Sequence, residues 1–373
     1  MIMNPYIYLR ALKHAEHTVF CVQKGQKTYY DARFNKYLPL SSGQQVKRSV
    51  LQLLTDNLNV PVSPVTFNYE IEIKKENNKI LKPKEPWATC NPTYVDQLIG
   101  GWMRAKNMAI SSDNEEESEQ KDEKSVLKRR SPLSISAMRP LHPLLAGIDE
   151  ECISFDRSDH PDYHPVNVRI KGTNKLLTEE EIEDFLDKNN RSLNRRIWIP
   201  DNKRTTGLFV YDIAIDLRTL FCVSTNQHEP EITKEMISSL KEKGWVESVN
   251  VFGNCLVLPK EERKKVIPAL ADALINWRIT SNQARTFSLM ETLAVAISDN
   301  ANTIASAIRA KLIDDGEKPK AKPIVDENAG AELYVALPCA SYIVTESESA
   351  EALENAKNSL ISRMMAFDYE HQL

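Results

Sequence analysis

The sequence predicts an α+β protein in which strands and helices surround one sheet and long insertions interrupt their order. Alternating apolar residues in segments 6–22 and 207–217 are typical of strands. Apolar residues at helical spacing follow each of these segments. Residues 59–130 and 139–206 are irregular instead, with many prolines in the first of them. A chain of 373 residues with 42% hydrophobic residues can bury a sizeable core.

The first strand and the first helix are predicted most directly. In segment 6–22, Tyr6 and Tyr8 alternate with Ile7 and Leu9, as expected of a strand. The following helix should begin at Gly43, because Ser42 and Gln45 fit a capping box. Its apolar face is formed by Val46, Val50, Leu54 and Leu58.

Two insertions separate this start from the rest of the predicted sheet. Residues 59–130 hold one expected helix, at 94–107, and an acidic stretch at 113–123 that has no apolar residue and should be a mobile loop. A short strand at 132–138 ends the first insertion. The second, 139–206, is loop-rich and holds one short helix, capped by Thr178 and Glu181.

The C-terminal part returns to regular patterns. After the strand at 207–217, the predicted elements are helices at 233–243 and 260–277, a strand at 289–298, a helix at 303–312, strands at 332–337 and 341–344, and a helix at 350–367. This order lacks the rhythm of a doubly wound sheet. It fits a ferredoxin-like split β-α-β core formed by residues 1–58, 131–138 and 207–373.

Charge and cysteine usage narrow the class of protein. The net charge is −4, but basic residues outnumber acidic ones in segments 1–60 and 188–204, so binding of nucleic acid is not excluded. The six cysteines are dispersed and never form C-x-x-C, which predicts reduced core residues without a disulfide framework or a cysteine-based zinc site. No signal peptide or membrane-spanning stretch is evident, so we expect a cytoplasmic protein without membrane contact.

Motifs of enzymes are mostly absent, and we expect no catalysis, no cofactor and no metal. The sequence contains no P-loop, dinucleotide-binding, nucleophile-elbow or zincin motif. Asp159, His160, Asp162 and His164 are metal-ligand residue types, but Pro161 prevents the helix that would align the two histidines. A solvated loop is the preferred interpretation there.

The start of the first helix has the residue types of a phosphate-binding site. Exposed backbone N–H groups and the positive end of the helix dipole would lie beside Ser42, Gln44, Lys47 and Arg48. The alternative is an ordinary solvated helix face. Arg10 and Lys13 would extend the basic track from the preceding strand, unless they are simply surface residues.

These residues carry a resemblance to a known family. Ser42, Gln44, Lys47 and Arg48 match the S-S-Q-x-x-K-R helix motif of the CRISPR-associated family-seven backbone subunits, particularly the DevR-type group of type I Cascade-like effector complexes, with Gly43 replacing the second serine. Segments 132–144, 207–217 and 277–298 are similar to further family strands and turns. The matching segments cover residues 6 to about 312 in order, although the insertions cannot be aligned.

The resemblance implies an RNA-recognition-motif-like palm with a fingers insertion (59–130) and a thumb insertion (139–206). It implies a non-catalytic subunit that binds the backbone of a CRISPR RNA (crRNA) and stacks head to tail with copies of itself. A head-to-tail interface that does not close into a ring produces such a filament. Backbone contacts suit any guide sequence. Further RNA contacts are expected at Met138, Arg139, His142, Asn282 and Arg285. Met138 and Trp198 would wedge against bases, although both residue types are more often core, and Asn282 and Arg285 could equally stabilise a turn.

The implied partners are those of a surveillance complex for antiviral defence. They are the crRNA, target DNA recognised through the guide for DNA interference, a large subunit, a subunit that binds the 5′ handle of the crRNA, and a crRNA-processing endonuclease. One alternative is an RNA-cleaving backbone subunit of a type III-like effector, with Asp31 in the loop where those relatives place an aspartate. That group's glycine-rich signature is missing from residues 38–49. A stand-alone RNA-binding protein or a metal-dependent enzyme is the other alternative.

Overall fold

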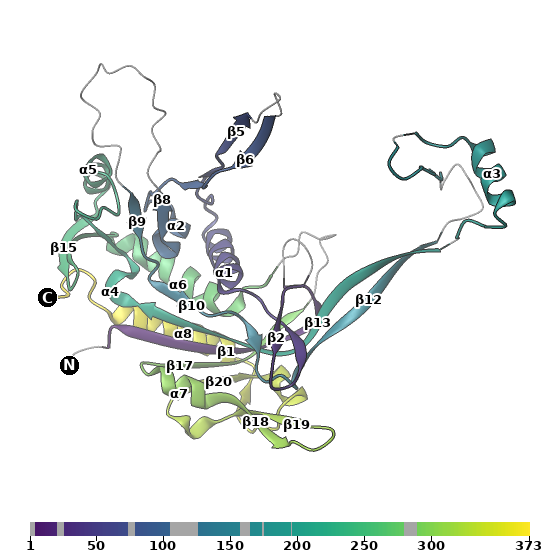
Figure 1. Ribbon diagram of the computed structural model, residues 1–373. Helices are drawn as coiled ribbons and strands as arrows, with labels where there is room; N and C mark the ends of the chain where they lie inside the picture. Colours follow the sequence, from purple (N-terminus) through teal and green to yellow (C-terminus); the bar gives the residue numbers. More distant parts are fainter. Residues whose placement is uncertain are drawn as a thin grey trace, which may run out of the picture. The chain divides into compact units, whose positions relative to one another are not determined.

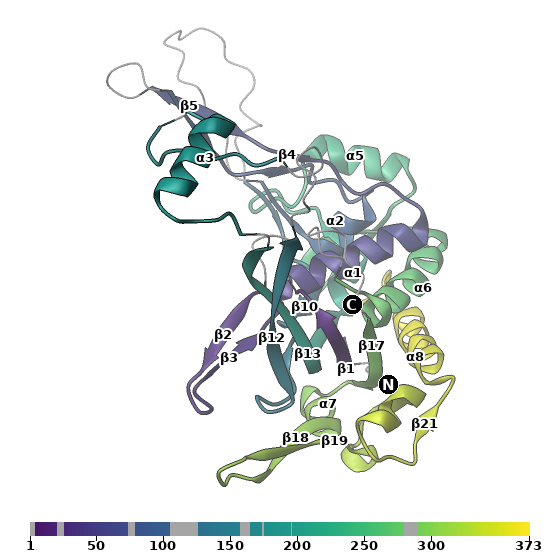
Figure 2. The same cartoon turned by 90° about the vertical axis from the view of Figure 1, so that its right-hand side faces the viewer.

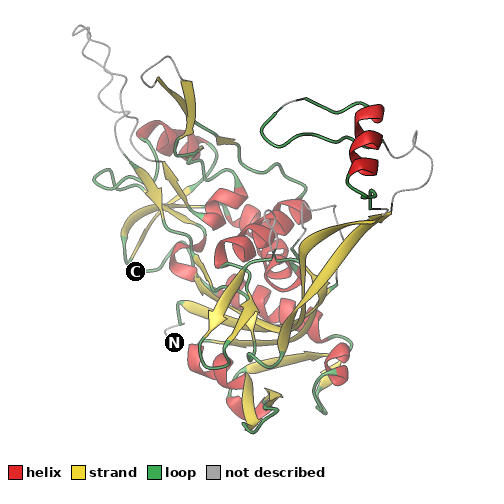
Figure 3. Ribbon diagram, turned by 45° about the vertical axis from the view of Figure 1, so that its right-hand side comes forward, coloured by secondary structure: helices red, strands yellow, loops and turns green. Residues whose placement is uncertain are grey.

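The computed structural model is of the α+β class, as the sequence predicts, and it contains both helices and strands (Figure 3). It describes residues 4–20, 26–73, 79–104, 126–156, 165–173, 175–194, 196–279 and 289–373. The chain divides into two compact units, residues 1–147 with 205–373, and residues 148–204. The acidic stretch 113–123 and the loop 159–164 lie outside the described residues.

The bounds of the helices and strands are as follows. The α-helices are α1 (Gly43–Leu58), α2 (Val95–Gly100), α3 (Glu179–Lys188), α4 (Leu217–Leu220), α5 (Lys234–Glu242), α6 (Lys260–Asn276), α7 (Ala301–Ala307) and α8 (Ala352–Ala366). The strands are β1 (Tyr6–Thr18), β2 (Thr28–Asp31), β3 (Lys36–Pro39), β4 (Val65–Thr66), β5 (Tyr69–Ile73), β6 (Lys79–Pro83), β7 (Trp87–Ala88), β8 (Trp102–Arg104), β9 (Leu127–Arg129), β10 (Leu133–Ile135), β11 (Arg139–Pro140), β12 (Ala146–Asp156), β13 (Arg196–Asp216), β14 (Cys222–Ser224), β15 (Val246–Asn250), β16 (Gly253–Val257), β17 (Met290–Ser298), β18 (Ile308–Asp314), β19 (Lys320–Val325), β20 (Glu332–Ala336) and β21 (Glu348–Ser349).

The largest sheet has β1 near its centre. Its strand order is β10-β13-β1-β17-β20-β21, and β1 is antiparallel to both of its neighbours. Because successive side chains of a strand point to opposite faces, Ile7, Leu9 and Ala11 enter one core while Leu12 enters another. Helices α1, α6 and α8 contribute to the first core (Figure 1), and α7 contributes to the second.

The second compact unit comprises most of β12, the first part of β13 and α3. Strands β12 and β13 pair with each other. Helix α3 carries the predicted capping box, in which the Thr178 side chain accepts from the Glu181 backbone N–H and the Glu181 side chain accepts from the Thr178 backbone N–H. Assignment of this unit to a thumb, and of residues 59–130 to fingers, stays a prediction.

Several predicted elements have other bounds than expected. The helix expected at 94–107 ends at Gly100, because Gly101 adopts a φ of +73° and the chain continues as β8. The helix expected at 303–312 ends at Ala307, because the following residues pair with β19 as strand β18. No strand forms at 341–344, since a 3-10 helix occupies Leu337–Ser341.

Candidate nucleic-acid interface

Helix α1 begins where the sequence predicts. Ser42 is its N-cap, and the Ser42 hydroxyl accepts a hydrogen bond from the Gln45 backbone N–H at 3.3 Å. In a full capping box the Gln45 side chain would accept from the Ser42 backbone N–H. Here the Gln45 side chain donates to Ser49 Oγ at 3.5 Å instead. Ser42 thereby satisfies one of the backbone donors that a helix start leaves free.

The start of α1 packs against the segment that follows β10. Ser41 forms an isolated antiparallel bridge with Met138, with N–H···O distances of 3.0 and 2.9 Å. A Cβ atom on Gly43 would lie 2.7 Å from the carbonyl oxygen of Ile135. The backbone therefore leaves no room for a side chain at position 43 unless something shifts, and the motif that α1 resembles has a serine at this position.

An exposed polar ridge leads away from this packed helix start. Gln44 and Arg48 are exposed and lie one helical turn apart, with Lys47 half-buried beside them. Burial, and then the nearby charge of Arg129, lower the pKa of Lys47 to about 8. Among the described residues, neither Lys47 nor Arg48 forms a salt bridge, so both cations are available to an anionic ligand.

A hairpin rich in aromatic and basic residues precedes α1. Strands β2 and β3 pair in register (Figure 2), and Tyr30 lies opposite Tyr37 on an outward face, where their side chains are 52% and 67% exposed. Their ring centroids are 5.4 Å apart. Leu38 on the other face is buried. Exposed aromatic rings are typical of surfaces that stack nucleobases.

His142 and Arg139 lie next to this hairpin. The His142 ring packs edge-on against Phe34 at 5.3 Å, and its Nδ1 accepts from the Leu144 backbone N–H at 3.1 Å. Burial, and then the charge of Lys36, lower the pKa of His142, which favours the neutral ring. Arg139 is exposed in β11, which contacts β3. The structure thus brings these two predicted residues toward the segment that leads into α1.

Three predicted RNA contacts have structural roles instead. Arg10 is a partner of Asp212 and of the Ile308 carbonyl, to which its Nη1 donates at 3.0 Å. Lys13 is 1% exposed, and its Nζ donates to the Ile275 carbonyl and to Thr292 Oγ1. Met138 is 0% exposed and belongs to the first core. The side chains of Arg10, Lys13 and Met138 therefore contact other parts of the protein and do not belong to the candidate interface.

Some predicted residues lie outside the described part of the chain, and some residues of the candidate interface are not predicted from the sequence. Asn282 and Arg285 lie outside the described residues, and so does the side chain of Trp198. The sequence motifs do not point to Tyr30, Tyr37, Arg33 or Lys36 as site residues, although aromatic and basic residues cluster in segment 28–37.

The described residues give no indication of a metal centre or a membrane span. No group of three or more His, Cys, Asp or Glu side chains among them has an arrangement that could hold a metal ion. Asp31 Oδ1 accepts from the backbone N–H groups of Arg33 and Phe34, both at 3.0 Å, which gives this aspartate a role in the β2–β3 turn. No helix in this part of the chain is both long and apolar enough to cross a membrane.

Comparison with known proteins gives weak structural likenesses only. No family model and no curated protein sequence matches the chain. One similar solved structure is a chain of a CRISPR RNA-guided surveillance complex in a pre-nicking state, at 10% identity and a TM-score of 0.39, covering 96% of this chain and 88% of that one. Another is a chain of a CRISPR RNA-guided surveillance complex, at 11% identity and a TM-score of 0.35, covering 96% and 83%. A third is Csc2 of Thermofilum pendens, at 10% identity and a TM-score of 0.27, covering 98% and 89%. Identities and TM-scores this low do not assign the chain to a family.

Proposed function

We propose that this chain is a non-catalytic subunit that binds the sugar-phosphate backbone of a guide RNA at the start of α1. The observation that carries the proposal is the ridge of Gln44 and Arg48, with Lys47 beside it, next to a helix start capped by Ser42. Two cations without a salt bridge, an amide and a helix N-terminus together suit phosphate oxygens.

The order of the sheet supports an RNA-recognition-motif-like palm. The chain runs from β1 through α1 to β10 and β13, then through α6 to β17, and these strands lie in the order β10-β13-β1-β17. Both β1 and β10 are antiparallel to β13, so they are parallel to each other with β13 between them. This strand order agrees with a ferredoxin-like split β-α-β arrangement, which the RNA-recognition motif shares, and so supports that part of the proposal.

The resemblance of the α1 motif extends the proposal to the setting. In the proposed setting, copies of the chain stack head to tail along the crRNA in a type I Cascade-like, DevR-type effector complex. This complex takes part in antiviral defence and recognises target DNA through the guide. Its partners are a large subunit, a 5′-handle-binding subunit and a crRNA-processing endonuclease. A subunit that holds only the RNA backbone accepts guides of any sequence.

A salt titration tests the proposal. Gln44 and Arg48 are exposed, so the double variant Gln44→Glu and Arg48→Glu should fold normally and weaken binding of single-stranded RNA equally for unrelated sequences. The slope of log K against log salt should become shallower by about 1, as expected when one phosphate contact is lost. Lys243→Glu, at an exposed position after α5, is the control for reversal of a single charge. Unchanged binding, or a loss for one sequence only, would contradict backbone binding at α1.

A further inference from the structure

A second candidate binding region lies in the first compact unit, lined by β9, β10 and the turn between β15 and β16. Its cavity has a volume of about 1300 Å³. Pockets for small molecules commonly measure roughly 300–1,000 Å³. A larger, open cavity suits a segment of an extended polymer better than a single metabolite.

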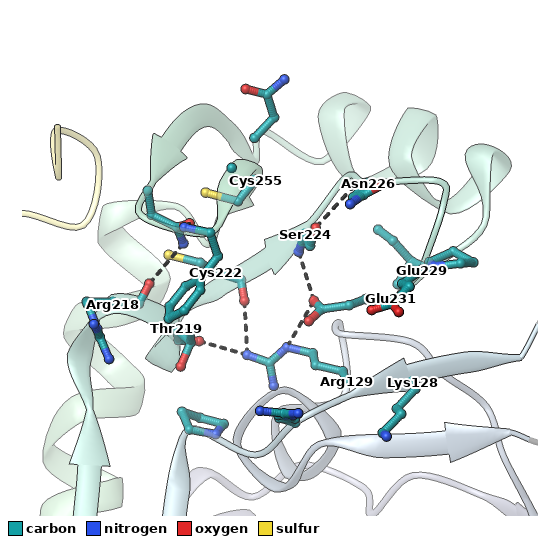
Figure 4. Close-up of a pocket in the computed structure, with 18 of the residues that line it drawn as sticks. Lys128, Arg129, Arg218, Thr219, Cys222, Ser224, Asn226, Glu229, Glu231 and Cys255 are labelled. Atoms are coloured by element: carbon teal, nitrogen blue, oxygen red, sulfur yellow. Dashed lines mark hydrogen bonds and ion pairs between the residues drawn. The ribbon is translucent and has the colours of Figure 1, made fainter.

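One wall of this cavity carries exposed cations. Lys128 and Arg130 are both exposed, while the residues that alternate with them, Leu127 and Arg129, are buried. Arg129 is occupied internally: its Nη2 donates to the carbonyls of Thr219 and Cys222 at 2.8 and 3.0 Å, and its Nε lies 3.7 Å from Glu231 Oε2 (Figure 4). Among the described residues, Lys128 and Arg130 form no ion pair, so their charges are available to a ligand.

Planar groups form a row beside this wall. The guanidinium of Arg218 lies 4.9 Å from the ring centroid of Tyr6 and 5.1 Å from that of Phe252. The rings of Tyr6 and Tyr8 continue the row, with centroids 5.8 Å apart and planes inclined by 20°. Asp216 fixes the guanidinium through bonds to Nε at 2.8 Å and Nη2 at 2.9 Å.

The outer end of the row is open to solvent. Phe252 is 60% exposed, and with Val251 it forms the two-residue connection between β15 and β16. Such connections favour glycine and asparagine, so two large apolar residues there are not explained by the turn itself. The Phe252 backbone N–H donates to Asn250 Oδ1, and Asn250 Nδ2 donates to the Arg218 carbonyl at 3.2 Å, which ties the turn to the main chain of Arg218.

We infer that this cavity binds unpaired nucleotides of a single-stranded nucleic acid, with a base stacked on Phe252 and phosphates beside Lys128 and Arg130. Every nucleobase has a flat face, so stacking tolerates any sequence. The inference rests on the proposed function and adds a second contact region to it. Glu229 and Glu235 line the cavity too, at the loop before α5 and at its start, and would repel a polyanion, which directs the strand to the wall formed by β9 and β10.

Removal of the stacking ring tests the inference. The probe is a fluorescent oligouridylate of about 10 nucleotides, within the site sizes common for single-strand binders. Phe252→Ala should raise Kd about tenfold, whereas Phe252→Tyr should retain binding. Phe67→Ala is the matched control, because Phe67 is also exposed, at 71%, and lies outside the cavity. A 4-thiouridine oligonucleotide should crosslink to peptides that contain Tyr6 or Phe252.

The outcomes separate this inference from the proposed function. If Arg48→Glu weakens binding while Phe252→Ala does not and no crosslink forms at Tyr6 or Phe252, the cavity is not a nucleotide site and the α1 proposal stands. If the unmodified protein binds no oligonucleotide, both fail. Binding of apolar peptides that depends on Phe252, without any effect of Phe252→Ala on the oligonucleotide, would make the cavity a protein-docking site and overturn the inference.

Discussion

Arg10 Nε lies 2.6 Å from Oδ1 of Asp212, directly across the β1–β13 ladder, where these two residues are register partners. The pair is partly buried, with side-chain exposures of 13% and 28%. Arg10 also donates to the Ile308 carbonyl, which links the ladder to the start of β18. A residue that the sequence placed on an RNA track therefore connects three strands of the protein.

Arg10→Gln should lower the stability of the protein and leave its RNA contacts intact. Loss of the guanidinium leaves Asp212 partly buried without its partner, which costs about 1–3 kcal/mol. Urea denaturation should show a lower midpoint, and the salt dependence of RNA binding should keep its slope. Arg309→Gln is a control, because its pair with Asp326 is more exposed, at 43% and 30%. A shallower dependence of RNA binding on salt, with unchanged stability, would show that Arg10 contacts RNA.

Much of the regular structure could be predicted because it depends on local patterns. The cap at Ser42 and the start at Gly43 follow from side-chain chemistry within one turn, and the alternation in β1 follows from two-sided burial. The roles of Arg10 and Lys13 could not be predicted in the same way. Their partners Asp212 and Thr292 are about 200 and 280 residues away, so only the tertiary fold shows that these cations face protein.

Gly43→Ser should destabilise the protein, although it introduces the second serine of the motif that α1 resembles. The new Cβ would lie 2.7 Å from a backbone oxygen, and backbone cannot move aside as a flexible side chain can. We expect a loss of about 1–3 kcal/mol in thermal or chemical unfolding. Gly147→Ser is the matched control, since nothing lies within 4 Å of a Cβ at that position. Equal stability of the two variants would show that the packing of α1 on residues 135–136 is looser than described.

Lys13 should make stability depend on pH. Burial, and then the charge of Arg278, lower the folded-state pKa of Lys13 from 10.5 to about 7. Between these values the unfolded chain binds more protons than the folded protein, so stability should rise as the pH rises from about 7 toward 10. Urea denaturation at several pH values should show this rise, and Lys13→Met should reduce it. Lys243→Met, at an exposed position, should not; a rise that survives Lys13→Met would assign it to another group.

Lys47 should make RNA binding depend on pH in the opposite sense. Its pKa in the free protein is lowered to about 8 by burial and by Arg129, whereas a phosphate next to the ammonium would raise the pKa in the complex. Binding therefore takes up a proton above about pH 8, and affinity should fall as the pH rises through that value. Below it, Lys47 is protonated in both states and contributes no dependence.

Two substitutions of Lys47 distinguish the effect of its charge on RNA binding from the effect of its shape. Lys47→Gln should bind weakly at every pH and lose the dependence, while Lys47→Arg should bind as well at pH 9 as at pH 7, because a guanidinium stays charged throughout. Fluorescence anisotropy with one RNA at constant ionic strength measures both, and circular dichroism confirms that each variant folds. If Lys47→Gln kept the fall in affinity above pH 8, the titrating group would lie elsewhere. Lys47 would then not be the source of the pH dependence of RNA binding.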